Sequence, residues 1–274
     1  MKRSVISLLC LLTASGLFAQ EIGLQLYSLR NEFKKDVPGT FAMIKEWGIT
    51  KVEDGNDGTQ GYTMPEYLEL LSKYNLEIVS ASASFEELEK TPETAIQRAQ
   101  AYGAKYLVCF WIPHEGTNFT AEDTQKAIKV FNKAGKLLKE NGITLAYHPH
   151  GYEFRPFGEI TLMDHMIQSA KHFEFEMDVY WFSFAGQDPV EWLKKYPKRF
   201  KLMHIKDCRK GVKGNNTGQS DVETNVTLGT GQIDIAAIAA EAKRLGLEYI
   251  FIEDESSRVV EQVPGSLEFL QGLD

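Results

Sequence analysis

The sequence predicts an α/β protein, a single (β/α)8 barrel. Eight short apolar runs alternate with segments of helical period, the pattern of parallel strands joined by crossover helices. Most helical segments end at a glycine or asparagine, residues that accept the left-handed backbone angles of a helix end. Setting aside residues 1–19 leaves 255 of the 274 residues, close to the ~250 of one such barrel. No Pro/Gly/Ser-rich linker divides residues 20–274, so we expect one closed domain there.

The order of the elements supports this fold. An open, doubly wound sheet is the alternative, but the first strand is followed by Ser28-Leu29-Arg30 and not by the glycine-rich phosphate turn of that fold. The predicted strands are Ile22–Tyr27, Ile49–Val52, Glu77–Ala81, Tyr106–Phe110, Ile143–His148, Phe173–Asp178, Phe200–Ile205 and Tyr249–Glu253. The predicted helices are Val37–Trp47, Pro65–Tyr74, Pro92–Tyr102, Thr120–Glu140, Val190–Tyr196 and Ile233–Leu245.

Residues 1–19 have the pattern of a secretory signal peptide. A basic start at Lys2-Arg3 precedes an apolar core over residues 5–12 and a small-residue exit at Ala19. This core is too short to span a membrane, and no other stretch approaches the roughly 20 apolar residues of a transmembrane helix. We therefore expect an exported, periplasmic protein that begins at Gln20 and is not inserted in the membrane.

The charge of the chain argues against nucleic acid or anionic membranes as partners. Lys2 and Arg3 leave with the predicted signal, so 28 of the 30 basic residues remain against 38 acidic ones, a net charge near −10. Phosphate binding relies on clustered Lys and Arg, which this balance disfavours. A small molecule is the expected partner, and the sequence leaves a homo-oligomer open.

Two features of the mature chain have open interpretations. Cys109 and Cys208 are the cysteines left after the signal, and two free thiols are favoured over a disulfide. Residues 208–232 form a long polar connection after the seventh predicted strand. In a barrel it would lie over the catalytic mouth, as a lid or specificity loop or as a passive surface loop.

Four polar residues lie at or just after the ends of the last four predicted strands: Glu153, Asp178, His204 and Glu253. Their spacings of 25, 26 and 49 residues fit the about 25–35 residues of a strand, a crossover helix and two loops, once or twice over. Because the carboxyl ends of parallel strands meet at one face of a barrel, we expect these side chains to lie close together. Such a set suits a divalent cation such as Mn²⁺, Co²⁺, Mg²⁺ or Zn²⁺. Helix caps and buried salt bridges are the alternative.

Further candidates lie beside the predicted ligands. His148 and His150 share a face, and either imidazole could act as a base near neutral pH or as a structural donor to a carboxylate. Trp181 could stack on a sugar face or fill the core. His148, Lys206 on the face of His204, and Glu53 at the end of the second strand are candidates for substrate binding. Glu53 could instead fix Arg30.

The sixth predicted strand raises a difficulty. Glu174, Glu176 and Asp178 share one face by strand parity, and three carboxylates inside a barrel must find partners. A twist or bulge could turn some of them outward, or Glu176 could support a ligand from a second layer.

The combined motifs resemble the xylose isomerase-like TIM barrel superfamily, and more narrowly its sugar (phosphate) isomerase/epimerase branch. The resemblance covers residues 22–270 and is specific for the fold and the metal site, but not for the substrate. The motifs are Gly23-Leu-Gln-Leu-Tyr-Ser-Leu-Arg30, Tyr147-His-Pro-His-Gly-Tyr-Glu-Phe154, Met177-Asp-Val-Tyr-Trp181, His204-Ile-Lys-Asp207 and Leu228-Gly-Thr-Gly-Gln-Ile-Asp234.

The resemblance implies one divalent cation held by Glu153, Asp178, His204 and Glu253. It also implies acid/base roles for Glu153 and Glu253, as in ketose epimerases, and His150 is a further catalytic candidate. One departure concerns the third strand, which often ends in His in these relatives and here reads Ser80-Ala-Ser-Ala-Ser84. Any proton transfer by that His is therefore in doubt in this chain.

A metal-dependent sugar isomerase or epimerase is the favoured function, acting through a metal-stabilised enediolate. Export favours a non-phosphorylated carbohydrate. A 3-keto-glycoside lyase or hydratase, which would eliminate a β group from the same intermediate, is the main alternative. A non-catalytic periplasmic sugar-binding protein is less favoured. An endonuclease of this fold would need extra metal ligands and a basic face, which the sequence lacks.

Overall fold

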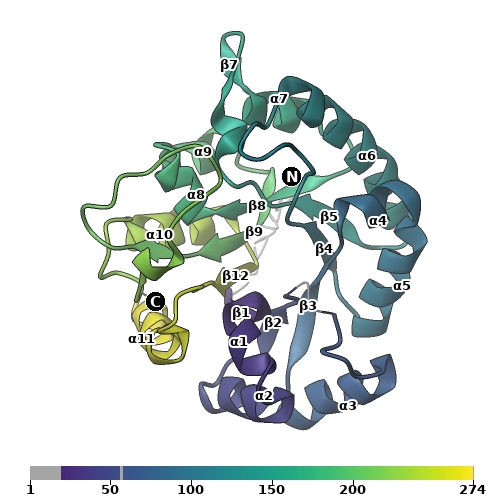
Figure 1. The fold of residues 1–274 in the computed structure, drawn as a ribbon, viewed down its shortest axis with the longest axis vertical. Helices are drawn as coiled ribbons and strands as arrows, with labels where there is room; N and C mark the ends of the chain where they lie inside the picture. The colour runs from purple at the N-terminus through teal and green to yellow at the C-terminus, as the bar shows by residue number, and fades with distance from the viewer. Residues whose placement is uncertain (1–19, 56–57, 274) are drawn as a thin grey trace, which may run out of the picture.

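The chain forms the predicted closed barrel (Figure 1). The computed structural model describes residues 20–55 and 58–273, so the predicted signal peptide lies outside the described residues. The eight barrel strands are all parallel and follow the order β1-β12-β9-β8-β5-β4-β3-β2. They are β1 (Glu21–Gln25), β2 (Lys51–Glu53), β3 (Glu77–Ser82), β4 (Tyr106–Cys109), β5 (Thr144–Tyr147), β8 (Glu174–Asp178), β9 (Phe200–Ile205) and β12 (Tyr249–Ile252).

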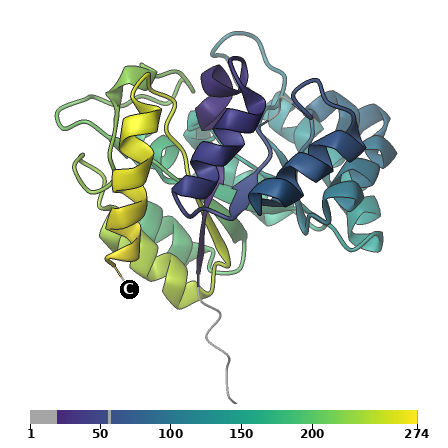
Figure 2. The ribbon, with the colours of Figure 1, turned by 90° about the horizontal axis from the view of Figure 1, so that it is seen from below.

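Helices surround the strands, as both views of the ribbon show (Figures 1 and 2). Asn75, Gly103 and Gly246 have left-handed backbone angles at helix ends, as the sequence predicts. The longer helices are α2 (Val37–Glu46), α3 (Met64–Tyr74), α5 (Pro92–Tyr102), α6 (Ala121–Glu140), α7 (Leu162–Ser169), α10 (Ile235–Leu245) and α11 (Val259–Gln271). The shorter ones are α1 (Arg30–Phe33), α4 (Phe85–Lys90), α8 (Val179–Phe184) and α9 (Pro189–Lys195), with 3-10 turns η1 (Leu26–Leu29), η2 (Tyr152–Phe154) and η3 (Val222–Thr224).

The core has two layers. A large apolar cluster fills the space between the strands and the helices. A smaller cluster that includes Leu202, Tyr249 and Phe251 is contributed by the barrel strands themselves. A side chain at Gly23 would place its Cβ 2.6 Å from the ring of Phe251, so β1 needs glycine there for the barrel to close. This filling forces any ligand to bind at a barrel end.

Several of the observed helices were not predicted, among them α8 and α11. The α8 helix starts directly after β8, because the Asp178 carboxylate accepts the backbone N–H groups of Tyr180 and Trp181 and so caps it. The α11 helix contains Pro264, a residue that usually argues against a helix interior. Short antiparallel pairs also lie outside the barrel: β6 (Pro156–Phe157) with β7 (Ile160–Thr161), and β10 (Asp207–Cys208) with β11 (Asn225–Val226).

Cys109 and Cys208 are both buried free thiols, as predicted. None of the helices within the described ranges is both long and apolar enough to cross a membrane.

Candidate metal centre and cavity

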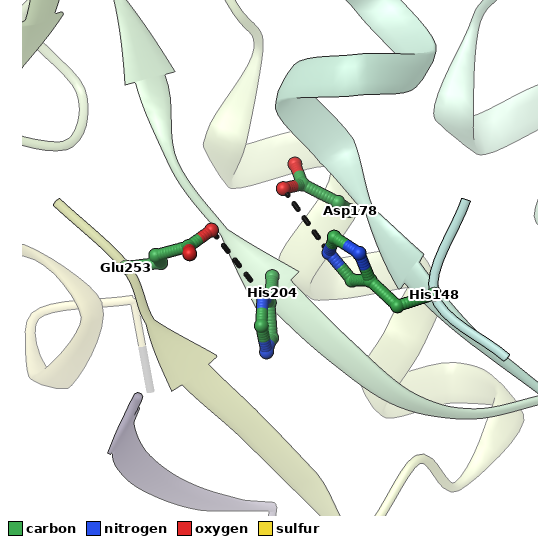
Figure 3. A group of neighbouring side chains, drawn as sticks. All are labelled: His148, Asp178, His204 and Glu253. Carbon is green, nitrogen blue, oxygen red and sulfur yellow. Dashed lines mark hydrogen bonds and ion pairs between the residues drawn. The ribbon is translucent and has the colours of Figure 1, made fainter. Parts of the chain in front are cut away.

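Four buried side chains converge at the carboxyl end of the barrel: His148, Asp178, His204 and Glu253 (Figure 3). They follow or end β5, β8, β9 and β12, which are neighbours in the barrel. One potential ligand atom from each lies within 4.8 Å of the others. The structure thus brings together three of the four predicted ligands, with His148 in the place expected for Glu153.

His148 and Asp178 leave buried polar atoms without hydrogen bonds. The Oδ1 of Asp178 caps α8, whereas its Oδ2 lies 3.4 Å from Nε2 of His148 and has no hydrogen-bond partner. Neither ring nitrogen of His148 has a hydrogen-bond partner. Burial raises the pKa of Asp178 to about 6, against the opposing effect of Lys206. Because buried polar atoms are almost always satisfied, these atoms fit a cation as their missing partner.

His204 is held between carboxylates. Its Nδ1 lies 3.3 Å from Oε2 of Glu253, and its Nε2 contacts Glu53 and lies 3.3 Å from Glu176. Burial by itself lowers the pKa of His204, but Glu176, Glu53 and Glu253 outweigh it and raise the pKa well above the ordinary value. Glu53 thus orients a predicted ligand and does not line the cavity.

The structure resolves the question of three carboxylates on β8. Glu174 pairs with Arg199 at 3.0 Å, Glu176 faces His204, and Asp178 belongs to the convergent group. Burial and the nearby Glu53 raise the pKa of Glu176 well above its ordinary value, so a neutral carboxyl is favoured there. Glu176 is therefore a second-layer group that faces His204, one of the two alternatives that parity left open.

Lys206 is a buried ammonium beside the group. Its Nζ lies 2.7 Å from Glu255 and 2.9 Å from Glu253, with Asp178 at 4.0 Å. Burial lowers the pKa of Lys206, but Glu253 and Glu255 outweigh it, so the charge is retained. Lys206 in turn helps to hold the pKa of Glu253 well below its ordinary range, against the opposing effect of burial. It is not among the residues that line the cavity.

Glu153 lies away from the convergent group. Tyr147 contacts Phe131 of α6, which places it on the outer face of β5 and His148 on the inner face. The Glu153 carboxylate accepts hydrogen bonds from the Tyr147 hydroxyl and from the backbone N–H of His150, at 3.1 Å for the latter. Burial raises the pKa of Glu153 to about 7, although the Tyr147 hydroxyl opposes the shift.

A cavity of about 580 Å³ opens at this end of the barrel. His148, His150, Trp181 and Glu253 line it, as expected of site residues. Its other lining residues were not among the predicted site residues, although Gln25 and Tyr27 lie in the first quoted motif and residues 218–220 and 222 lie in the connection predicted to cover the mouth. These other lining residues are Gln25, Tyr27, Gly55, Phe110, Trp111, Gly218, Gln219, Ser220, Val222 and Glu255.

Hydrogen bonds hold the connection over residues 208–232 at the barrel end. Its residues 218–220 and 222 line the cavity. The Asp207 carboxylate accepts backbone N–H groups from Gly229 at 3.1 Å, Gly231 at 2.9 Å and Ile233 at 3.1 Å. Farther along, Arg258 donates to Glu223 at 2.9 Å. These contacts hold the loop in a fixed shape, in which it forms part of the cavity wall.

The family model described as a xylose isomerase-like TIM barrel matches residues 41–273. The chain belongs to this family. Its curated relatives include inosose dehydratases. One from Clostridium tetani is 35% identical over 95 residues, covering 34% of this chain and 32% of that protein. One from Clostridium perfringens is 32% identical over 175 residues, covering 55% and 58%. The chain thus spans only a third to just over half of these relatives.

Solved structures agree with the family over nearly the whole chain. A sugar phosphate isomerase/epimerase from Parabacteroides distasonis superposes with a TM-score of 0.75 at 25% identity, covering 92% of this chain and 97% of that one. An IolI protein with a bound zinc atom superposes with a TM-score of 0.70 at 12% identity, covering 93% and 98%. The second likeness shows the fold alone.

Proposed function

We propose that the protein is a metal-dependent enzyme that removes a proton next to the carbonyl of a non-phosphorylated carbohydrate. The observation that carries the proposal is the convergence of His148, Asp178, His204 and Glu253 at the carboxyl end of the barrel, where His148 and Glu253 also line the cavity. These four residues would hold one divalent cation. When bound, it would supply Lewis-acid stabilisation of the negative charge that develops on the carbonyl oxygen.

Besides His148 and Glu253, the cavity lining within the described residues includes the imidazole of His150 and the carboxylate of Glu255. Burial and the nearby His148 lower the pKa of His150 well below its ordinary value, so its imidazole is neutral, the form that can accept a proton. Glu255 lies two residues after Glu253 in the segment that follows β12. Its carboxylate accepts a hydrogen bond from Lys206 at 2.7 Å. We assign His150 as the base and Glu255 as the group that orients the sugar hydroxyls.

The lining of the cavity supports a neutral sugar. Phe110 and Trp181 offer apolar ring faces, and Gln25 and Gln219 offer amide donors and acceptors. Within the described part of the chain, no Lys or Arg side chain lines this cavity. A phosphate group would find no cationic partner among the lining residues.

We propose β-elimination as the outcome: His150 takes the proton, the C–H electron pair forms a carbon–carbon double bond, and the β C–O bond breaks. The leaving hydroxyl or glycosidic oxygen keeps the C–O electron pair and takes up a proton from the His150 imidazolium or from water. Two findings support this choice. Exchange of a proton between the two faces of a sugar by two glutamates would need Glu153 and Glu253 in the cavity, and Glu153 is hydrogen-bonded to Tyr147 instead. The inosose dehydratases among the relatives are named for loss of water.

Isomerisation or epimerisation is the second candidate. It is favoured by the likeness, at 25% identity, to a protein named as a sugar phosphate isomerase/epimerase. The same loss of a proton would then be followed by its return to the other face or to the neighbouring carbon.

Proton NMR in deuterated buffer tests both outcomes. The protein is loaded with Mn²⁺, Zn²⁺ or Mg²⁺ and is offered free sugars, keto-cyclitols and 3-keto-glycosides. Reactions with Zn²⁺ or Mg²⁺ can be followed directly in the spectrometer. Mn²⁺ is paramagnetic and is removed before spectra are recorded. Loss of water or release of an aglycone is the expected result. Deuterium incorporation without cleavage assigns an isomerase or epimerase. A protein that takes up no divalent cation and exchanges no proton contradicts both candidates and points to a non-catalytic sugar-binding protein.

The export signal over residues 1–19 remains a proposal. Mass spectrometry of the protein from its native cell envelope is expected to find Gln20 at the amino terminus. A mature chain that still begins at Met1 would contradict export by this route.

A further inference from the structure

Few large apolar and aromatic side chains are exposed in the part of the chain that the structure describes. Among the described residues, the large hydrophobic side chains with high exposure are Tyr27, Trp111, Phe157, Val260 and Leu273. Two of these five, Tyr27 at 37% and Trp111 at 47%, line the cavity that His148 and Glu253 of the convergent group also line. Exposed aromatic rings at the mouth of a binding cavity are typical of ligand contact.

Trp111 is fixed in place before any ligand arrives. Its ring lies 4.4 Å from the ring of His114, centroid to centroid, at an angle of 31°. Its backbone carbonyl accepts the Cys109 thiol at 3.3 Å, and the next carbonyl, of Ile112, contacts Nδ1 of His114 at 2.7 Å. The exposed indole is therefore a preformed surface, which lowers the entropy cost of binding.

Tyr27 is supported in the same manner on another side of the barrel mouth. The guanidinium of Arg30 lies 4.6 Å from the centroid of the Tyr27 ring and donates to the Tyr27 carbonyl at 3.1 Å. The other end of this guanidinium donates to the Glu255 carbonyl at 2.9 Å. A side chain at Gly55 would place its Cβ 2.5 Å from the Tyr27 backbone nitrogen, so glycine there allows the loop after β2 to pack against Tyr27.

The cavity is larger than one sugar ring needs. Its volume of about 580 Å³ lies within the roughly 300–1,000 Å³ range of sites that enclose drug-sized ligands. His148, His150, Trp181 and Glu253 occupy the part nearest to the convergent group, where the reacting sugar must lie. The exposed rings of Tyr27 and Trp111 remain for a second part of the ligand.

We infer that Tyr27 and Trp111 form an outer subsite for a second ring, so the substrate is a glycoside and not a free monosaccharide. The inference rests on the proposed function and names its substrate class. The second ring is a pyranose or an aromatic aglycone, since each has an apolar face that stacks on indole or phenol. Tyr27 and Trp111 touch this ring and not the reacting carbon, so they determine specificity.

Binding of unreactive glucosides tests the subsite without turnover. The metal-loaded protein is titrated by calorimetry with D-glucose, phenyl β-D-glucoside and cellobiose, none of which carries the ketone that the proposed reaction needs. Both two-ring probes are expected to bind about tenfold more tightly than glucose, because each gains a stacked ring. A preference for phenyl glucoside alone identifies an aryl aglycone, and a preference for cellobiose alone identifies a sugar.

The variants W111A and Y27A locate the effect, with F157A as the matched control. Phe157 is exposed to the same 37% as Tyr27 but lies on the β6–β7 hairpin and does not line the cavity. W111A and Y27A are expected to reduce the tenfold preference to less than threefold and to leave glucose affinity unchanged, whereas F157A changes neither. If wild-type protein binds one-ring and two-ring probes equally, or if W111A weakens all probes alike, the subsite is disproved while the proposed function stands. Binding of no probe, together with no turnover in the NMR test, disproves both.

Discussion

Glu53 on β2 contacts Nε2 of His204 on β9, two strands that do not pair in the barrel. The same carboxylate accepts hydrogen bonds from Ser80 at 2.6 Å and Gln25 at 3.1 Å. A carboxylate can only accept, so Nε2 of His204 carries the hydrogen, and Nδ1 is directed towards Glu253 at 3.3 Å. Glu53 therefore fixes the tautomer and orientation that a metal-binding histidine needs.

The variant E53Q is expected to weaken the affinity for a divalent cation by about 10–100-fold, the usual effect of losing a carboxylate behind a histidine ligand. Competition with a chromophoric chelator measures the affinity directly. E268Q, an exposed glutamate on α11, serves as the control and should bind metal like wild type. Equal affinity of E53Q and wild type would show that Glu53 does not support the site.

The variants H148A and E153Q distinguish the two candidate metal ligands that follow β5. Because His148 faces Asp178 and Glu153 is hydrogen-bonded to Tyr147, H148A is expected to weaken metal binding by about 100-fold or more. E153Q should retain a full equivalent of metal. Elemental analysis after gel filtration measures both stoichiometries, and circular dichroism checks that each variant is folded. Loss of metal from E153Q alone would restore the ligand set implied by the family resemblance.

The stability of the protein should fall as the Glu153 carboxyl ionises. Burial raises its pKa from 4.5 to about 7 in the folded protein, so the neutral form stabilises the fold fully below about pH 4.5. This contribution is lost as the pH rises through 7 and amounts to about 3 kcal/mol at most. Urea unfolding at pH 5 and pH 8, in chelator, should show a smaller decrease for E153Q than for wild type. E159Q, an exposed glutamate, should keep the wild-type decrease, and an identical decrease in all three proteins would contradict the assignment.

Gly231 allows Asp207 to anchor the loop over the cavity. A Cβ at this position would lie 2.2 Å from Oδ1 of Asp207 and 2.3 Å from the carbonyl of Cys208. G231A should therefore lower the free energy of unfolding by about 1–3 kcal/mol, the cost of overpacking. In G272A the nearest contacts are at 3.4 Å, so its unfolding should change by less than that. Thermal melts of the two variants provide the comparison, and equal stability would contradict the anchoring role of Asp207.

The location of the site could be predicted because strand ends follow from local patterns. The predicted strands differ from the observed ones by one or two residues at most ends, and Asp178, His204 and Glu253 converge as expected. The ligand on strand five could not be chosen in this way. His148 and Glu153 are both polar residues after the same strand. The chain turns at Gly151 between them, so the sequence pattern does not indicate which of the two side chains points towards the barrel axis.

The sequence by itself determined the barrel, the end at which the site lies and the residue types that would hold a cation, because side-chain period and turn residues are local properties of the chain. Only the tertiary structure decided that His148 joins the group, that Glu53 and Glu176 form a layer behind His204, and that Tyr27 and Trp111 share one cavity. These relationships depend on which strands become neighbours and on how loops return across the barrel mouth. Neither is set by the spacing of residues along the chain.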